Sequence, residues 1–319
     1  MITIRVPAST SNLGSGFDSL GLALRLYLTV HVDWTENQYG SFVFKGEGAQ
    51  SLRDVTEDNL IFRAMRYASA AEEIELKPAR ILVENDIPLA RGLGSSGAAI
   101  IAGISVFEAV SGVRLESDKI LAYATQIEGH SDNISAALLG SFVVSCVTAD
   151  GRVLAEKISW PEQVHAVVVT PDFKVRTEQA RAVLPDNIAY RDAVFNIQRS
   201  SLMVAAVAAG RLDLMGEAMR DRLHQSYRAG LVPGLDRILE MGEQELAASP
   251  GYLGLALSGS GPTVVALATG DFDRIAGAIS GGFKENGIES KHLVLPIDVR
   301  GRVVEEFEGD SDREIEEEQ

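Results

Sequence analysis

The sequence predicts an α+β protein built from two packed domains. Its 319 residues are many for one hydrophobic core, which favours two domains over one. Segments in which apolar and polar residues alternate, as in strands, are interspersed with segments of helical spacing. With 46% hydrophobic and 23% charged residues, the composition is that of a soluble globular protein.

The first half of the chain contains both kinds of segment. Residues 2–6 alternate like a strand that ends at Pro7, and a loop over 12–21 leads to a second alternating stretch. Asn59 is a suitable N-cap for the helical spacing that follows it. The elements expected here are strands over 2–6, 24–34, 80–84 and 141–147 and helices over 60–68, 96–111 and 117–127.

The second half begins after the polar turn Ser159-Trp160-Pro161, where we place the domain boundary. The elements expected beyond it are strands over 165–170, 254–257, 263–268 and 291–297 and helices over 192–209, 212–224, 234–248 and 271–283. The prediction is therefore a first domain over 1–160, a second over 161–304 and an acidic, disordered tail over 305–319.

Charge and hydropathy exclude several classes of partner. The net charge of −16 argues against nucleic acid and anionic membranes, and half of it comes from nine acids and one arginine in the tail. No apolar run approaches the roughly 20 residues that cross a bilayer, and the first residues lack the layout of a signal peptide. We therefore expect a cytoplasmic protein. The single cysteine, Cys146, lies in an apolar stretch that predicts a buried structural thiol.

The most informative segment is a glycine-serine turn that leads into a helix of small residues. Gly92 and Gly94 allow backbone conformations in which consecutive N–H groups point into one concavity. The first N–H groups of the following helix, and its dipole, would face the same concavity. Ser95 and Ser96 add hydroxyls that either cap the helix or bind a magnesium ion carried by phosphates. The predicted ATP-binding loop consists of Pro88, Leu89, Ala90, Arg91, Gly92, Leu93, Gly94, Ser95, Ser96, Gly97 and Ala98.

This loop is neither of the two commonest nucleotide loops, because it lacks the Gly-Lys-Ser/Thr ending of a Walker A sequence and the spacing of a dinucleotide fold. Its pattern, Pro-x-x-x-Gly-Leu-Gly-Ser-Ser, resembles instead the phosphate loop of the GHMP kinases. Residues 128–133, Glu-Gly-His-Ser-Asp-Asn, and 257–263, Leu-Ser-Gly-Ser-Gly-Pro-Thr, are similar to further motifs of that superfamily. The opening motif over 6–21 resembles that of the homoserine kinases in particular.

The resemblance covers nearly the whole chain and implies a fold and an activity. The implied fold is that of the GHMP kinases, with an N-terminal ribosomal-protein-S5-like domain and a C-terminal α/β sandwich domain in which helices pack on an antiparallel sheet. ATP and substrate would meet between the two domains. The implied activity is an ATP- and Mg²⁺-dependent phosphorylation of the L-homoserine hydroxyl, which yields O-phospho-L-homoserine for threonine biosynthesis.

Phosphoryl transfer requires a phosphate cradle, a magnesium ion and a positioned acceptor hydroxyl. The resemblance implies that Ser96 binds the metal and that Asn59 contacts the nucleotide base. Glu128 is the only acidic residue within 119–131, which makes it the candidate carboxylate ligand. Alternatively, Asn59 serves only as a helix cap, and Glu128 is only a solvated residue at the end of a helix.

A small amino acid as acceptor calls for groups of both charges. Its carboxylate favours the planar guanidinium group, and Arg181 and Arg228 lie in segments that resemble the family's substrate contacts. Its ammonium group calls for a carboxylate or neutral oxygens, and the resemblance implies Asp18 and Asn12 in this role. The substrate-binding residues implied in this way are Asn12, Asp18, His130, Asn133, Arg181, Arg228 and Gly259.

The adjacent residues Asp132 and Asn133 offer two catalytic mechanisms. Either the aspartate takes the proton of the acceptor hydroxyl, as in several GHMP kinases, or the asparagine orients the hydroxyl without a strong base. Neighbouring residues cannot both point at one atom, and a loose transition state builds little early charge on the nucleophile. We therefore expect Asn133 to orient the hydroxyl and Asp132 to brace the turn.

Two alternative functions stay open at this stage. The first is a GHMP kinase for another small alcohol, such as mevalonate or a shikimate-like acid. Mevalonate has no ammonium group, so Asn12 and Asp18 would then serve no purpose. The second is a catalytically inactive relative that senses a metabolite, against which the intact loop and the Asp132-Asn133 pair argue. Because relatives are often dimers, a homodimer is also compatible with the sequence.

Overall fold

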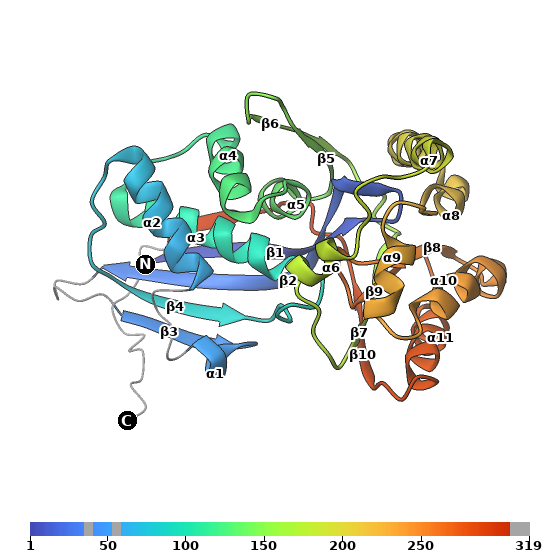
Figure 1. Ribbon diagram of the computed structural model, residues 1–319. Helices are drawn as coiled ribbons and strands as arrows, with labels where there is room; N and C mark the ends of the chain where they lie inside the picture. The colour runs from blue at the N-terminus through green and yellow to red at the C-terminus, as the bar shows by residue number, and fades with distance from the viewer. Residues whose placement is uncertain (35–40, 53–58, 307–319) are drawn as a thin grey trace.

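The structure, a computed structural model, describes residues 1–34, 41–52 and 59–306, and it contains two sheets with their own helices (Figure 1). The first sheet has the strand order β11-β1-β2-β4-β3, and β5 pairs with β2 and with β6. All of its pairs are antiparallel except β3 with β4. Its strands are β1 (Ile2–Asn12), β2 (Gly16–Trp34), β3 (Ser41–Gly46), β4 (Ala79–Asn85), β5 (Phe142–Val147), β6 (Val153–Ile158) and β11 (Val303–Glu306).

Helices pack on one face of this sheet (Figure 1). The longest of these helices, α3, lies against β1, β2 and three other helices, and its residues are buried on almost every side. A helix that is apolar all round belongs in a protein interior. Its first turn is therefore held rigidly at the point where the phosphate loop ends. These helices are α2 (Leu60–Glu72), α3 (Ser95–Ser111), α4 (Ser117–Glu128) and α5 (Asp132–Leu139), and a short α1 (Ala49–Leu52) follows β3.

The second sheet is antiparallel, with the order β10-β7-β9-β8. Its strands are β7 (His165–Pro171), β8 (Tyr252–Leu257), β9 (Val264–Ala268) and β10 (Ser290–Leu295). The helices around it are α6 (Thr177–Ala182), α7 (Tyr190–Ala209), α8 (Met215–Ala218), α9 (Gln225–Arg228), α10 (Leu235–Gln244) and α11 (Phe272–Lys284).

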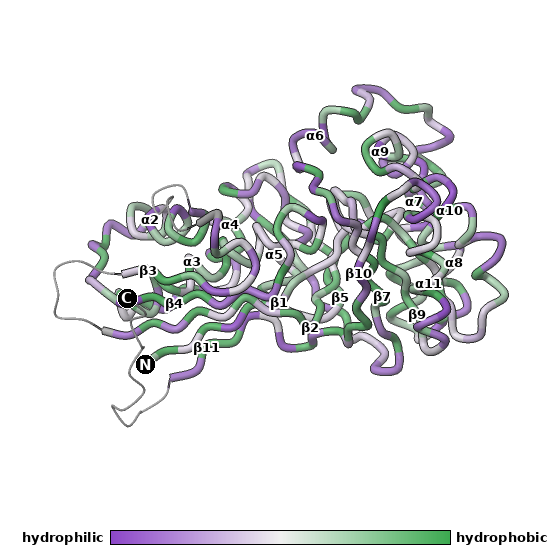
Figure 2. Tube along the Cα trace, turned by 90° about the horizontal axis from the view of Figure 1, so that it is seen from below, coloured by the Kyte–Doolittle hydropathy of each residue, from purple (hydrophilic) through white to green (hydrophobic). Residues whose placement is uncertain are grey.

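Both faces of the second sheet are buried, because side chains alternate between two hydrophobic clusters. Ala166 and Val168 join the core of the first sheet, whereas Val167 and Val169 join a separate core under α10 and α11. Hydrophobic residues gather along the inner strands, and the loops near α6 are hydrophilic (Figure 2). The shared core fixes the two halves against each other, which is what a site between them requires.

The structure corrects three expectations, two near the first motif and one after α7. The first strand does not end at Pro7 but continues to Asn12, because a register shift between Pro7 and Ala8 lets the pairing with β2 resume. The expected loop over 12–21 is only a short turn, since β2 begins at Gly16. The expected helix over 212–224 ends at Ala218 instead, in α8.

Two further expectations, the burial of Cys146 and the disorder of residues 305 and 306, are wrong. Cys146 is exposed, because the last residues of β5 extend beyond the core together with β6. Glu305 and Glu306, expected in the tail, form the end of β11, which pairs with the first residues of β1. Residues 303–306 therefore belong to the first sheet, and the rest of the predicted tail, 307–319, lies outside the described residues. In the part of the chain that is described, no helix combines the length and apolar character needed to cross a bilayer.

Candidate active site

A cavity of about 400 Å³ is lined by residues of both halves. Three of the sequence motifs meet beside it through hydrogen bonds to main-chain carbonyl groups. Ser9 N–H donates to Leu93 O at 3.1 Å, and Gly259 N–H donates to Ser11 O at 3.2 Å. Ser258 Oγ donates to Gly92 O at 2.5 Å. The opening motif, the glycine-serine loop and the turn after β8 thus form one framework around the cavity.

The glycine-serine loop has the backbone of an anion cradle. Ala90, Gly92 and Gly94 have φ angles of 55°, 78° and 67°, so left-handed residues alternate with others along the loop. Such alternation turns successive N–H groups toward one side. Gly94 is the N-cap of α3 and contributes no side-chain cap, which leaves the first N–H groups of that helix available to an anion.

Glycine is required at two loop positions by space as well as by conformation. A Cβ atom on Gly92 would lie 2.2 Å from Ser258 O, against main chain that cannot yield. A Cβ atom on Gly94 would lie 2.1 Å from Ser9 Oγ and 2.9 Å from Asn133 Oδ1. The loop therefore packs directly on β1 and α5.

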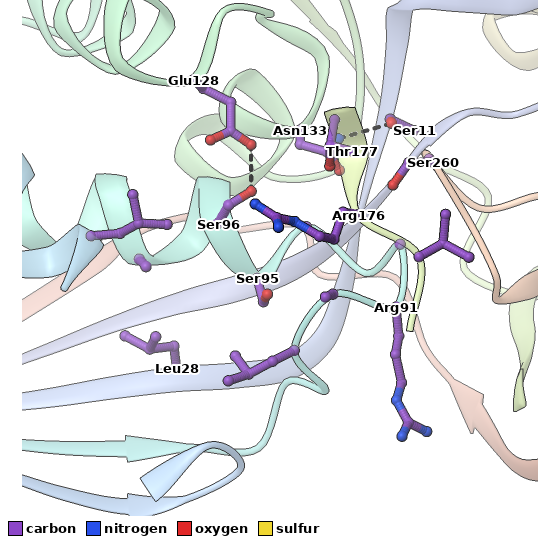
Figure 3. Close-up of a pocket in the computed structure, with 18 of the residues that line it drawn as sticks. Ser11, Leu28, Arg91, Ser95, Ser96, Glu128, Asn133, Arg176, Thr177 and Ser260 are labelled. Atoms are coloured by element: carbon purple, nitrogen blue, oxygen red, sulfur yellow. Dashed lines mark hydrogen bonds between the residues drawn. The ribbon is translucent and has the colours of Figure 1, made fainter. Parts of the chain in front are cut away.

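Ser96 and Glu128 form the oxygen pair that was predicted for a metal ion. Ser96 Oγ donates to Glu128 Oε1, which comes from the last residue of α4 (Figure 3). The Glu128 side chain is only 11% exposed, so its alternative as a solvated helix end does not apply. In the described part of the chain no three His, Cys, Asp or Glu side chains cluster as a metal site. The donors present suit a cation that is held mainly by the ligand's own phosphates.

Most predicted ATP contacts line the cavity, but four loop residues do not. Leu89 to Gly92 and Gly94 to Ser96 line it, as does Asn59. The Asn59 side chain also accepts a hydrogen bond from Ile61 N–H at 2.8 Å, so it caps α2 while facing the cavity. The loop residues outside the lining are Pro88, Leu93, Gly97 and Ala98, of which Leu93 and Ala98 have their side chains in the core.

The residues predicted to hold opposite ends of an amino acid hold each other in the ligand-free structure. Arg181 donates from Nη1 and Nη2 to the two carboxylate oxygens of Asp18, at 3.0 and 2.8 Å. Asn12 accepts from Asp18 N–H through Oδ1 and donates to Gly259 O through Nδ2, both at 3.0 Å. Asn12, which also lines the cavity, thus holds Asp18 and Gly259 in place on its wall.

Arg228 is a buried cation on the cavity wall. It is 2% exposed, and it donates to Gly259 O at 2.9 Å and to Ala180 O at 3.1 Å. No carboxylate among the described residues lies within ion-pair distance of it. Burial, aided by the nearby charge of Arg181, lowers the pKa of Arg228 to about 10, which still leaves it charged at neutral pH. A buried guanidinium group without a counter-ion calls for an anionic ligand.

His224 and Phe17 support Arg228, and the sequence did not single them out. His224 Nε2 donates to Gly14 O at 2.8 Å, and its Nδ1 accepts from Arg228 Nη1 at 3.3 Å. Burial lowers the pKa of His224, which agrees with this neutral tautomer. The Phe17 ring stacks on His224 with centroids 5.1 Å apart, and the Arg228 guanidinium lies 5.3 Å from its centroid. The spacing of four between His224 and Arg228 on a short helix is the signal that could have revealed the pair.

Asp132 and His130 form a second buried pair. His130 Nδ1 lies 2.7 Å from Asp132 Oδ1, which also accepts from Asn133 N–H at 2.7 Å. Burial alone would raise the pKa of Asp132, but His130, Asn133 N–H and Ser11 outweigh it and the net shift is downward. Burial likewise opposes a charged His130, yet Asp132 and Glu128 raise its pKa overall. Both shifts favour the ion pair of imidazolium and carboxylate, and the lowered pKa makes the carboxylate a weaker base.

The Asn133 amide is held by two serines of β1. Its Oδ1 accepts from Ser9 Oγ at 2.8 Å, and its Nδ2 donates to Ser11 Oγ at 2.8 Å (Figure 3). Asn133 and Ser11 both line the cavity. The sequence named Asn133 but missed the two serines, although both lie in the opening motif. With the amide fixed, any hydroxyl that enters here meets oriented polar atoms.

The comparisons with known proteins identify the family of the chain. The family models of the GHMP kinases N terminal domain and of the GHMP kinases C terminal match residues 59–141 and 203–285. A homoserine kinase of Persephonella marina is 39% identical over 308 residues, covering 97% of this chain and 99% of the relative. One of Aquifex aeolicus is 40% identical over 296 residues, covering 92% and 96%.

Solved structures lead to the same group. The crystal structure of homoserine kinase from Cytophaga hutchinsonii superimposes with a TM-score of 0.83 at 28% identity, covering 95% of this chain and 96% of that one. These matches confirm the fold class and the resemblance that the motifs indicated. The chain belongs to the GHMP kinases. Within them it falls among the homoserine kinases, whose members it matches over nearly its full length.

Proposed function

We propose that this protein transfers the γ-phosphoryl group of ATP to the side-chain hydroxyl of L-homoserine and releases O-phospho-L-homoserine and ADP. The observation that carries the proposal is the composition of a single cavity. One part of its wall is an anion cradle at the start of α3, and another holds a buried arginine and an acid–arginine pair. The first suits a triphosphate and the second suits a zwitterion. The relatives named homoserine kinase support this assignment.

The cavity residues divide the binding between them. The loop N–H groups would bind the β- and γ-phosphates, and the Ser96 and Glu128 oxygens would hold a magnesium ion that neutralises charge on those phosphates. Arg228 and Arg181 would bind the homoserine carboxylate, and Asp18 its ammonium group. When homoserine binds, the ion pair between Asp18 and Arg181 would be replaced by two ion pairs with the substrate, one to its ammonium group and one to its carboxylate.

At the reacting hydroxyl the protein supplies orientation. Asn133 Oδ1 has a second lone pair that would accept the hydrogen bond of the substrate hydroxyl, while Ser9 and Ser11 keep the amide from rotating. Asp132 would stay ionised with its charge committed to His130. Orientation and phosphate neutralisation can supply most of the rate when the transition state is loose.

A coupled ADP-release assay tests the proposal with matched acceptors. L-homoserine should give turnover, whereas 4-hydroxybutyrate, which lacks the ammonium group, and 3-aminopropanol, which lacks the carboxylate, should each lose more than about tenfold in kcat/KM. Mevalonate and shikimate should stay at the level of the blank. ADP release with mevalonate but not with L-homoserine would mean that mevalonate is the acceptor. No release with any alcohol would favour the alternative of an inactive metabolite sensor.

The proposal also includes a cytoplasmic location, expected from the hydropathy of the sequence, and a homodimer, which the resemblance implies. A sedimentation experiment on the purified full chain tests the second. A mass near 68 kDa, twice the 34.2 kDa of the chain, is the expected result. A mass of one chain at micromolar concentration would remove the dimer from the proposal and leave the activity untouched.

A further inference from the structure

Among the described residues, four arginines line the cavity, and three of them are engaged by neighbouring protein groups. Arg91 donates to Pro171 O and to Asp172, both at 3.0 Å, and in Figure 3 it points away from Ser95 and Ser96. Arg181 is bound to Asp18, and Arg228 is bound to main-chain carbonyls. The fourth, Arg176, is the one whose role the homoserine site does not account for.

Arg176 lies just before α6 and sends its side chain into the cavity. In Figure 3 it extends from the segment that leads to Thr177 across the opening toward Ser96 and Glu128. Its ion pair is weak, because Nε lies 3.5 Å from Glu178 Oε2 and both side chains are about three-quarters exposed, at 74% and 78%. Exposed pairs of this kind contribute little and exchange readily for a better anion.

The wall near Ser96 has few other cations to offer a triphosphate. The acid at this point is Glu128, and the chain as a whole carries a net charge of −16. Lys45 also lines the cavity, but it lies on β3, the outermost strand of the first sheet and the far one from β1. A guanidinium group can bind two phosphoryl oxygens at once, which a single ammonium group cannot match.

We propose that Arg176 is a catalytic residue that binds the terminal phosphoryl group of ATP during transfer. This inference rests on the proposed function. In the step, the bond from Pγ to the bridging oxygen breaks and leaves its electron pair on ADP. A bond from the acceptor hydroxyl oxygen to Pγ forms, and the hydroxyl proton leaves to water. Arg176 contacts the non-bridging oxygens of the moving group and offsets their charge.

The first test measures nucleotide binding alone. Titration calorimetry compares Arg176→Gln with wild type for two Mg²⁺-bound probes, ADP and the non-hydrolysable analogue AMP-PNP. Arg176→Gln should weaken AMP-PNP binding about tenfold to a hundredfold, the effect of one hydrogen-bonded charged contact, and should leave ADP binding unchanged. Arg152→Gln is the matched control, since Arg152 is 71% exposed with an ion pair to Asp150 and does not line the cavity. Equal AMP-PNP affinity in wild type and Arg176→Gln would overturn the inference.

The second test uses turnover and separates the inference from the proposed function. Arg176→Gln should lower kcat by a similar factor and leave the KM for homoserine unchanged, and Arg176→Lys should recover only part of the loss. If wild type does not phosphorylate homoserine, the proposed function fails, whereas the calorimetric comparison still decides the role of Arg176. If Lys45→Gln and not Arg176→Gln weakens AMP-PNP binding, the cation is Lys45 and the inference is wrong.

Discussion

The phosphate part of the cavity is built from main-chain groups, whereas the amino-acid part is built from side chains. The phosphate part consists of main-chain N–H groups at the buried start of α3, with glycine where a side chain cannot fit. The amino-acid part consists of side chains from β2, α6 and α9, which already contact one another. Main-chain donors depend on local conformation, whereas the side-chain cluster depends on packing of distant segments. The two parts should therefore respond differently to substitution.

The largest effect is expected at the phosphate part. Gly94→Val combines a left-handed residue with a Cβ atom 2.1 Å from Ser9 Oγ, so it should abolish ATP-analogue binding, a loss of at least about a hundredfold or 2.7 kcal/mol. Gly112→Val is the control, because Gly112 ends the same helix at φ 77° with open space around it. Calorimetry with AMP-PNP checks both folded variants. Equal losses in the two would assign the effect to helix strain rather than to the cradle.

The next effect is expected at the amino-acid part. Arg228→Leu should raise the KM for homoserine by about 30-fold or more, the roughly 2–5 kcal/mol that follows loss of one partner in a desolvated charge pair. Arg181→Leu should have a smaller effect, because Arg181 is 38% exposed and solvent screens its charge. Steady-state kinetics with each substrate varied in turn give the values. A rise in the KM for ATP alone would place the affected arginine on the phosphates.

The same difference explains what the sequence could predict. The loop over 88–98 was identified correctly as a turn into a helix, because glycine spacing and small residues specify a backbone shape locally. The role of Asn59 as a helix cap was equally local. The amphipathic helix α11 and the apolar strand β7 also lie where they were expected.

Features that depend on distant packing were not predictable. The helix expected over 212–224 ends at Ala218, and Asp221 accepts hydrogen bonds from the N–H groups of Leu223, His224 and Gln225 where α9 starts. The sequence periodicity contains no sign of this capping. The contact of Asp18 with Arg181 joins residues 163 positions apart, so only the fold brings them together.

A smaller effect on turnover is expected at the centre of the cavity. Asp132→Asn should lower kcat less than about tenfold, well under the 10²–10⁴-fold of general-base catalysis, because the Asp132 carboxylate is committed to His130. Asn133→Leu is the comparator and should lose more, since it removes the contacts to Ser9 and Ser11. Kinetics at saturating substrates measure both. If kcat collapses in Asp132→Asn while homoserine still binds, Asp132 is the base and the assignment of Asn133 is reversed.

The smallest effect concerns the stability that the His130–Asp132 pair contributes, and its sign can be derived. The pKa of His130 is raised, so its contribution is complete below the ordinary histidine value of about 6.5 and is lost as pH rises through the higher folded pKa. The pKa of Asp132 is lowered, so its contribution is complete above the ordinary value of about 3.9 and is lost as pH falls through the lower folded pKa. The contributions of both groups are thus complete together only between the two ordinary values, from about pH 4 to 6.5.

His130→Gln should consequently destabilise the protein most between about pH 5 and 6 and less as the pH rises above 7. Glu128 favours the charged imidazole and Arg181 disfavours it. The decrease of the His130→Gln effect with pH should therefore follow the net upward shift of the His130 pKa. Urea unfolding of wild type and variant at matched pH measures the difference in free energy of unfolding. His292→Gln, which removes an imidazole at an exposed position on β10, is the control. A His130→Gln difference that grows with pH would mean that the buried imidazole is neutral, and Asp132 would then regain the basicity that the ion pair removes.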